Sequence, residues 1–239
     1  MLCEHNHTRT TNIERGTMTS RIEEKELLVP ADFDLFREVH SYYNFMVLIN
    51  PRAGNTVWVN NLVIHNHLSN HALIRIIDTG SLFEKPSDSM NGISLNLPCA
   101  FPLPLNISDN ELVTFDLSDL VLPDLLLEKK LCVMNTIAQD LRSTSDRLKI
   151  IIFDNLPEFI KDGGDTLLDI IKRVCREAKS YNGMIFAHAY SPGDVEKLGG
   201  LGTAVANLFD AIYAVRQPLE EMETLERMGI SGHFRQPKA

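Results

Sequence analysis

The sequence lacks any uninterrupted apolar run that approaches the ~20 residues needed to cross a bilayer. Its most apolar region, Leu117 to Met134, is interrupted by Pro123 and by several charged residues. Cysteine is also scarce: the chain has 4, widely spaced and without a CxxC pair. This spacing indicates neither a zinc site nor a disulfide framework, so we expect reduced thiols in a cytoplasmic protein.

Basic residues are outnumbered by acidic ones. The 239 residues include 23 Lys and Arg against 32 Asp and Glu, which gives a formal net charge of -9. A surface that grips nucleic acid phosphates requires a stripe of positive charge, and this balance disfavours one. We therefore expect no direct sequence-specific binding of nucleic acid.

The N-terminal part of the chain is polar and charged, without the apolar segment of a secretory signal. We interpret residues 1–30 as a flexible polar lead-in, and both Met1 and Met18 stay open as the start of translation. Residues 31–239 are expected to form one domain, because a chain with 44% hydrophobic residues can bury one substantial core at this length.

Short apolar runs rich in β-branched residues alternate with helical patterns along this domain. The runs are Phe45 to Ile49, Leu73 to Ile77, Glu111 to Phe115, Lys149 to Phe153, Gly183 to Ala187 and Ala211 to Val215, with a shorter one at Ile93 to Leu97. Several are apolar on both faces, as buried parallel strands are. Helical spacing of apolar residues connects Leu127 to Leu141 and Leu167 to Ala178. The pattern predicts an α/β fold with a mostly parallel sheet and helices on both faces.

The segment after the first predicted strand has the layout of a phosphate-binding loop without its charged group. A P-loop reads G-x-x-x-x-G-K-[S/T], and the frame falls on Ile49 to Thr56. Gly54 and Thr56 match the pattern, but Ile49 stands at the first glycine position and Asn55 at the lysine position. If nucleotide binds, we expect Gly54, Asn55 and Thr56 to contact it and the Thr56 hydroxyl to hold Mg²⁺. Helix capping by Asn55 and Thr56 is an equally good interpretation.

A second candidate position follows the apolar run Ile150 to Phe153. The run ends in Asp154, which is typical of a buried strand that delivers a carboxylate to Mg²⁺. Hydrolases usually carry Glu next, which polarises the attacking water, whereas this chain has Asn155. An amide cannot accept a proton as a carboxylate does. The alternative for Asp154 is a turn former or helix cap at a strand end.

The order of these segments resembles that of the conjugative-transfer and type IV secretion ATPases of the VirB/TraC kind, which have a TraG-type P-loop domain. The matching segments lie between about Tyr43 and Gln217. After the P-loop-like segment they are RIIDTGSLFEK, LNLPCAFPLPLN, VTFDLSDL, IIIFDN, CREAKSYNGMIFAHAYSPGD and ANLFDAIYAVRQ. The resemblance implies a P-loop NTPase-like (RecA-like) fold and a role in type IV secretion or conjugative DNA transfer.

The departures from the family pattern concern the residues that would do the chemistry. Asn55 replaces the P-loop Lys, Asn155 replaces the catalytic Glu, and His188 lies near the position of a Gln. Lys179 aligns with an Arg and keeps its charge, but not the planar fork suited to a phosphate. The connection near 106–111 is short, as if the helical insert of the family were missing.

These departures favour a degenerate, non-hydrolysing ATPase-like component, with no catalytic residue intact and with ATP and Mg²⁺ bound weakly or not at all. The alternative is a motor ATPase that holds Mg²⁺ through Thr56 and Asp154 and is active within a complex. A third interpretation is a truncated relic without a role in the machine. His188 as a satisfied strand-end histidine and Lys179 as a solvated helix end also stay open.

Partners and location follow from the same resemblance. It implies contact with other type IV secretion components, or a homo- or hetero-oligomeric ring. It also implies a position in the cytoplasm or at the cytoplasmic face of the inner membrane, held there through partners.

Overall fold

The computed structural model describes residues 44–49, 71–80, 83, 90–96, 107–118, 123–143, 145–161, 163–215, 217–230 and 234–235. Their strands are β1 (Asn44–Ile49), β2 (Leu73–Asp78), β3 (Ile93–Asn96), β4 (Leu112–Asp116), β5 (Lys149–Phe153), β6 (Gly183–Ala189), β7 (Ala211–Val215) and β8 (Phe234–Arg235). Every predicted apolar run is a strand, and β5 and β7 have the predicted bounds. The two-residue β8 was not predicted, because no apolar run marks it in the sequence.

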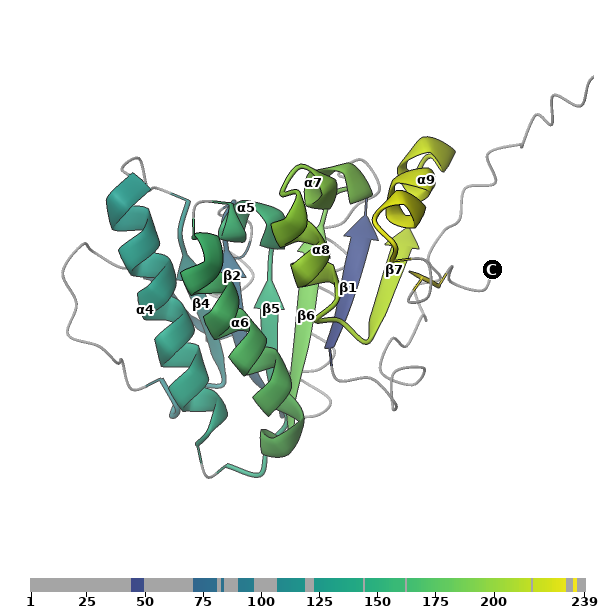
Figure 1. Ribbon diagram of the computed structural model, residues 1–239. Helices are drawn as coiled ribbons and strands as arrows, with labels where there is room; N and C mark the ends of the chain where they lie inside the picture. Colours follow the sequence, from purple (N-terminus) through teal and green to yellow (C-terminus); the bar gives the residue numbers. More distant parts are fainter. Residues whose placement is uncertain are drawn as a thin grey trace, which may run out of the picture.

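The strands form one eight-stranded sheet in the order β3-β4-β2-β5-β6-β1-β7-β8. Every pairing in this sheet is parallel, as predicted. Because the strands all run the same way, their carboxyl ends meet at one edge (Figure 1). The order also separates β1 from β5 by one strand, β6.

The described helices are α4 (Pro123–Leu141), α5 (Leu156–Ile160), α6 (Gly164–Ala178), α7 (Pro192–Glu196), α8 (Gly200–Ala206) and α9 (Leu219–Arg227). The two long ones, α4 and α6, confirm the predicted helical patterns. The short helices were missed, because five to nine residues span too few turns for a 3.6-residue period to stand out. None of the described helices has both the length and the apolar composition that a membrane span requires.

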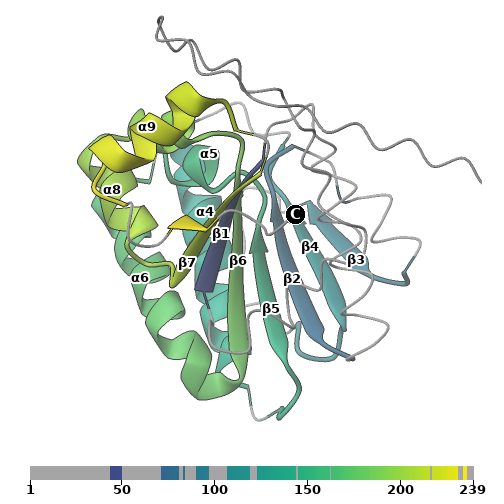
Figure 2. The ribbon, with the colours of Figure 1, turned by 90° about the vertical axis from the view of Figure 1, so that its right-hand side faces the viewer.

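The described helices lie on one side of the sheet, as the turned view shows (Figure 2). The described residues confirm the predicted helices on this face. Helices on the other face stay a prediction, since the residues between β1 and β2 lie largely outside the described part. Apolar side chains nevertheless fill both faces. On β1, Met46 and Leu48 join the core beneath α4 and α6, whereas Phe45 and Val47 join a second apolar layer on the opposite face.

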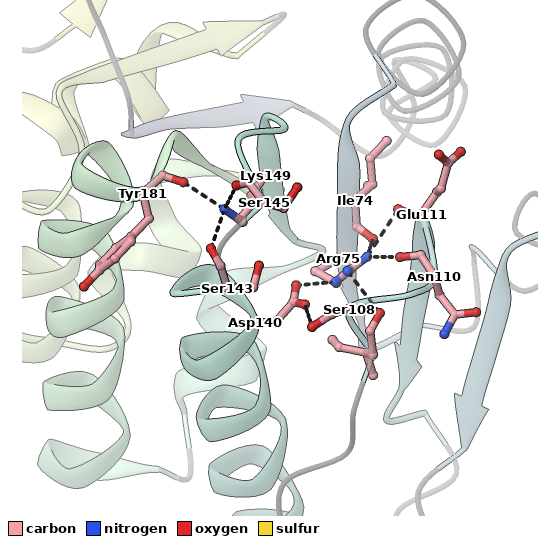
Figure 3. Close-up of polar contacts among 11 residues, drawn as sticks. Ile74, Arg75, Ser108, Asn110, Glu111, Asp140, Ser143, Ser145, Lys149 and Tyr181 are labelled. Carbon is pink, nitrogen blue, oxygen red and sulfur yellow. Dashed lines mark hydrogen bonds and ion pairs between the residues drawn. The ribbon is translucent and has the colours of Figure 1, made fainter.

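Toward the amino end of the sheet, Arg75 is a buried cation, with 1% of its surface exposed, and each of its three nitrogens donates a hydrogen bond. Its Nε donates to Asp140 Oδ2 of α4 at 2.7 Å, and Ser108 Oγ donates to the other oxygen of Asp140 at 3.0 Å (Figure 3). Its remaining nitrogens donate to the backbone carbonyls of Ile74, Ile107, Asn110 and Glu111. One guanidinium therefore connects β2, α4 and the turn that leads into β4.

Lys149, the first residue of β5, closes the same edge. Its Nζ donates to the carbonyl oxygens of Ser145 at 2.8 Å and Tyr181 at 3.2 Å (Figure 3). Burial lowers the pKa of Lys149, while the carboxylate of Asp140 acts in the opposite direction. The connection that leads into β4 is a separate matter, and its described residues, 107–111, run directly into that strand. That a helical insert is missing there stays a prediction.

We expect the substitution Arg75→Leu to lower the free energy of unfolding by about 3–5 kcal/mol, because it leaves Asp140 buried and unpaired. Urea denaturation measures this loss. The double substitution Arg75→Leu with Asp140→Leu should recover most of it, since neither charge of this pair then remains buried without the other. As a matched control, Arg142→Leu breaks an ion pair with Glu177 at the surface and should cost less than about 1 kcal/mol. An equal loss from both Arg substitutions would contradict this account.

Candidate functional site

Three acidic residues follow one another along the carboxyl edge of the sheet. Asp116 and Asp78 end the neighbouring strands β4 and β2 and are partners in register. Phe153 of β5 is the register partner of Ile77, so Asp154 comes directly beside Asp78. In parallel α/β sheets, ligands bind outside the carboxyl ends of the strands. This edge is therefore the first place to look for a site.

Two of these acids are occupied by their own turns. Asp78 accepts hydrogen bonds from the backbone N–H of Gly80 at 2.9 Å and of Phe83 at 2.8 Å, one on each oxygen. Asp116 Oδ1 accepts from the backbone N–H of Ser118 at 2.9 Å and from its hydroxyl at 2.7 Å. Both acids shape the chain that leaves the strand, as Asx turns do.

Asp154 differs from them. Its side chain is buried, its Oδ1 lies 3.2 Å from Nδ1 of His188, and its Oδ2 has no hydrogen-bond partner in the described part of the chain. Its backbone is fixed, since its N–H donates to the carbonyl of Ile77 and its own carbonyl accepts from the Thr79 hydroxyl. The capping residue of α5 is Asn155 and not Asp154. Asp154 is thus a firmly held carboxylate with one oxygen unused.

His188 reaches Asp154 because β6 lies next to β5. His188 is fully buried, and its ring packs edge-on against Tyr190 at 5.0 Å between centroids. Burial raises the pKa of Tyr190, and so do the carboxylates of Asp154 and Asp78. The phenol therefore keeps its proton in a region of negative charge. The site consists of two strand ends, one open carboxylate oxygen and two aromatic side chains.

No protein-family model matches the sequence, and no curated protein matches it either. Among solved structures, VirB4 of Thermoanaerobacter pseudethanolicus superimposes with a TM-score of 0.64, at 10% identity over 78% of this chain and 80% of that chain. The chain shares the fold of VirB4. This likeness confirms the predicted α/β fold class, and at such low identity it is a likeness of fold alone.

Within the VirB4-like fold, Asn155 has a conformation of its own. Its φ and ψ are 57° and 62°, the left-handed region that residues other than Gly rarely adopt and that Asn tolerates best. Its side chain makes no capping hydrogen bond. The backbone alone therefore gives a reason for Asn at this position, where the family resemblance would place Glu.

The structure does not bring Lys179 to this site. Lys179 is exposed and follows the last residue of α6, just before β6 begins, so it lies at the amino edge of the sheet. This position agrees with a helix end and excludes direct contact with Asp154 within one chain. The remaining predicted site residues, Gly54, Asn55 and Thr56, lie outside the described residues.

Gln217 is a residue of this edge to which sequence reasoning gave no role. Its Nε2 donates to the backbone carbonyl of Tyr190 at 2.9 Å, and its Oε1 is buried without a partner among the described residues. It follows β7 and links that strand end to the end of β6. Tyr190, which comes directly after β6, was missed as well, although it stands two residues after His188, the spacing at which side chains of extended chain lie on one face.

The donor set can be compared with the Mg²⁺ that the sequence motifs predict. In the described part of the chain, no group of three or more His, Cys, Asp or Glu side chains could hold a metal ion. Mg²⁺ does not need such a group, because it is usually held through one or two carboxylates together with waters and substrate phosphates. The open Oδ2 of Asp154 fits that role. A part for Thr56 stays a prediction.

We expect Asn155→Gly to leave stability unchanged or to raise it, because Gly adopts the left-handed conformation without strain. Asn155→Ala and Asn155→Glu should each lower the free energy of unfolding by about 1 kcal/mol relative to Asn155→Gly. Urea denaturation of the three variants gives the comparison. A Glu variant as stable as the Gly variant would show that the backbone does not select Asn here.

Proposed function

We propose that this protein is a degenerate ATPase-like component of a type IV secretion or conjugative DNA transfer apparatus that does not hydrolyse ATP. The VirB4-like fold supports the proposal, together with the ordered motif-like segments that the sequence shares with the VirB/TraC ATPases. The observation that carries it is the pair Asp154 and Asn155. The first keeps the place and burial of a Mg²⁺-binding carboxylate, whereas the second has no carboxylate to activate water.

The other substitutions point the same way. Asn55 has no charge with which to meet the oxygens of a triphosphate. The cation at Lys179 lacks the planar fork of an arginine finger, a group that is worth roughly 10³-fold or more in rate. Cation, base and fork are therefore altered together, and each alteration slows phosphoryl transfer. On this proposal ATP and Mg²⁺ bind weakly or not at all.

Such a protein would act through its surface. We propose that it packs against other secretion components, or in a homo- or hetero-oligomeric ring, and that these partners hold it at the cytoplasmic face of the inner membrane. Conjugative transfer of DNA and secretion of protein both fit this role.

We expect the purified protein to release phosphate from ATP no faster than a no-enzyme control, since it has neither the Lys nor the Glu. A coupled phosphate-release assay measures this rate, with Asp154→Ala as the matched control. Turnover well above background that disappears in Asp154→Ala would overturn the proposal.

A second candidate function is a motor ATPase that binds nucleotide and works within a complex. The open Oδ2 of Asp154 favours it, because a relic site has no need to keep a buried carboxylate oxygen unpaired. Calorimetric titration with ATP and Mg²⁺ separates the two functions. Stoichiometric, Mg²⁺-dependent binding by the natural sequence favours the motor, whereas binding only by Asn55→Lys indicates a disabled loop.

A further inference from the structure

The two oxygens of Asp154 have different surroundings. Oδ1 faces Nδ1 of His188 at 3.2 Å, and the side chains of Asp154 and His188 are only 3% and 1% exposed. Oδ2 is equally buried and meets no hydrogen-bond donor within the described residues. A buried carboxylate oxygen without a partner costs free energy unless water, a cation or a ligand meets it. Whatever enters this site is therefore expected to bind Oδ2.

The charge around Oδ2 favours a cation. Asp78, the neighbouring acid, has each of its oxygens turned to a backbone N–H. The phenol of Tyr190 is neutral, since burial and the nearby carboxylates raise its pKa. Among the described residues, the ion pair of Asp154 is formed with His188 and with no Lys or Arg.

We propose that His188 is a positioning residue, which restricts Asp154 to ligation of a divalent cation through one oxygen and so favours Mg²⁺ or Mn²⁺ over Ca²⁺. When the carboxylate is ionised it can only accept, so Nδ1 carries the hydrogen and occupies Oδ1. Ca²⁺ takes six to eight oxygens and often both oxygens of one carboxylate. Mg²⁺ takes six ligands in a strict octahedron, and one carboxylate oxygen with waters and phosphates suffices.

This inference deepens the proposed function, in which nucleotide and Mg²⁺ bind weakly, and it does not require hydrolysis. It concerns His188, which stands near the position at which the resemblance places Gln. Hydrogen-bonded partners of a metal ligand fix its orientation, and losing one typically costs about 10- to 100-fold in metal affinity.

The test uses the full chain with ADP and Mn²⁺. The electron paramagnetic resonance signal of free Mn²⁺ reports binding, and Mg²⁺ or Ca²⁺ is then added as competitor. We expect Mg²⁺ to displace Mn²⁺ from the natural sequence at lower concentration than Ca²⁺ does. In His188→Leu, the Mn²⁺ affinity should fall about tenfold, and the preference for Mg²⁺ over Ca²⁺ should narrow because Oδ1 is released.

Two matched variants complete the experiment. His188→Asn places an amide N–H close to the former Nδ1 and should restore both the affinity and the cation preference. Asp154→Asn should remove Mn²⁺ binding beyond that of ADP alone, which assigns the ion to Asp154. If circular dichroism shows that His188→Leu does not fold, His188→Gln takes its place. The Gln amide lies one bond further from the strand than Nδ1 does, so it should not replace the hydrogen bond to Oδ1.

The inference is overturned if removing the imidazole leaves both the Mn²⁺ affinity and the order of competitors unchanged. It is also overturned if the natural sequence binds no Mn²⁺ in an Asp154-dependent manner. Neither outcome decides whether the protein hydrolyses ATP, and rapid ATP turnover would contradict the proposed function while leaving the role of His188 intact. A merely structural role of His188 would lower the melting temperature without changing the cation preference.

Discussion

The parallel pairing of β5 with β2 on one side and β6 on the other is the constraint on which the candidate site depends. Phe153 is the register partner of both Ile77 and Ala187. The next residue along the chain therefore stands beside Asp78 and within reach of His188. A shift of this register by one residue would turn every side chain of β5 to the opposite face and would separate Asp154 from the imidazole.

The buried cations near the amino edge of the sheet and the buried acid at the carboxyl edge differ in how they are paired. Near the amino edge, the guanidinium of Arg75 and the ammonium of Lys149 each donate to several carboxylate or carbonyl oxygens. At the carboxyl edge, Asp154 and Gln217 each keep one buried oxygen without a partner in the described chain. Full pairing stabilises a fold, whereas an open acceptor is useful only if something else binds it.

The strands were predictable because buried parallel strands are apolar on both faces, and so were α4 and α6 because they are long enough to show helical periodicity. The position of Asp154 at the end of a buried strand was predictable from the apolar run that precedes it. The backbone reason for Asn at position 155 was not predictable, since the sequence does not show that this residue has a left-handed conformation. The contact of Asp154 with His188, and the distance of Lys179 from both, needed the strand order, which a single sequence does not contain.

The place of β1 in the sheet has a consequence for folding during synthesis. β1 is the first of the described strands, yet its two neighbours in the sheet are β6 and β7, which follow more than 130 residues later. A growing chain on the ribosome therefore cannot pair β1 with either neighbour until synthesis has passed Gly183. Contacts so distant in sequence form slowly. Until then the apolar residues of β1 are exposed and can aggregate. Chaperones bind exposed hydrophobic segments of this kind and prevent their aggregation.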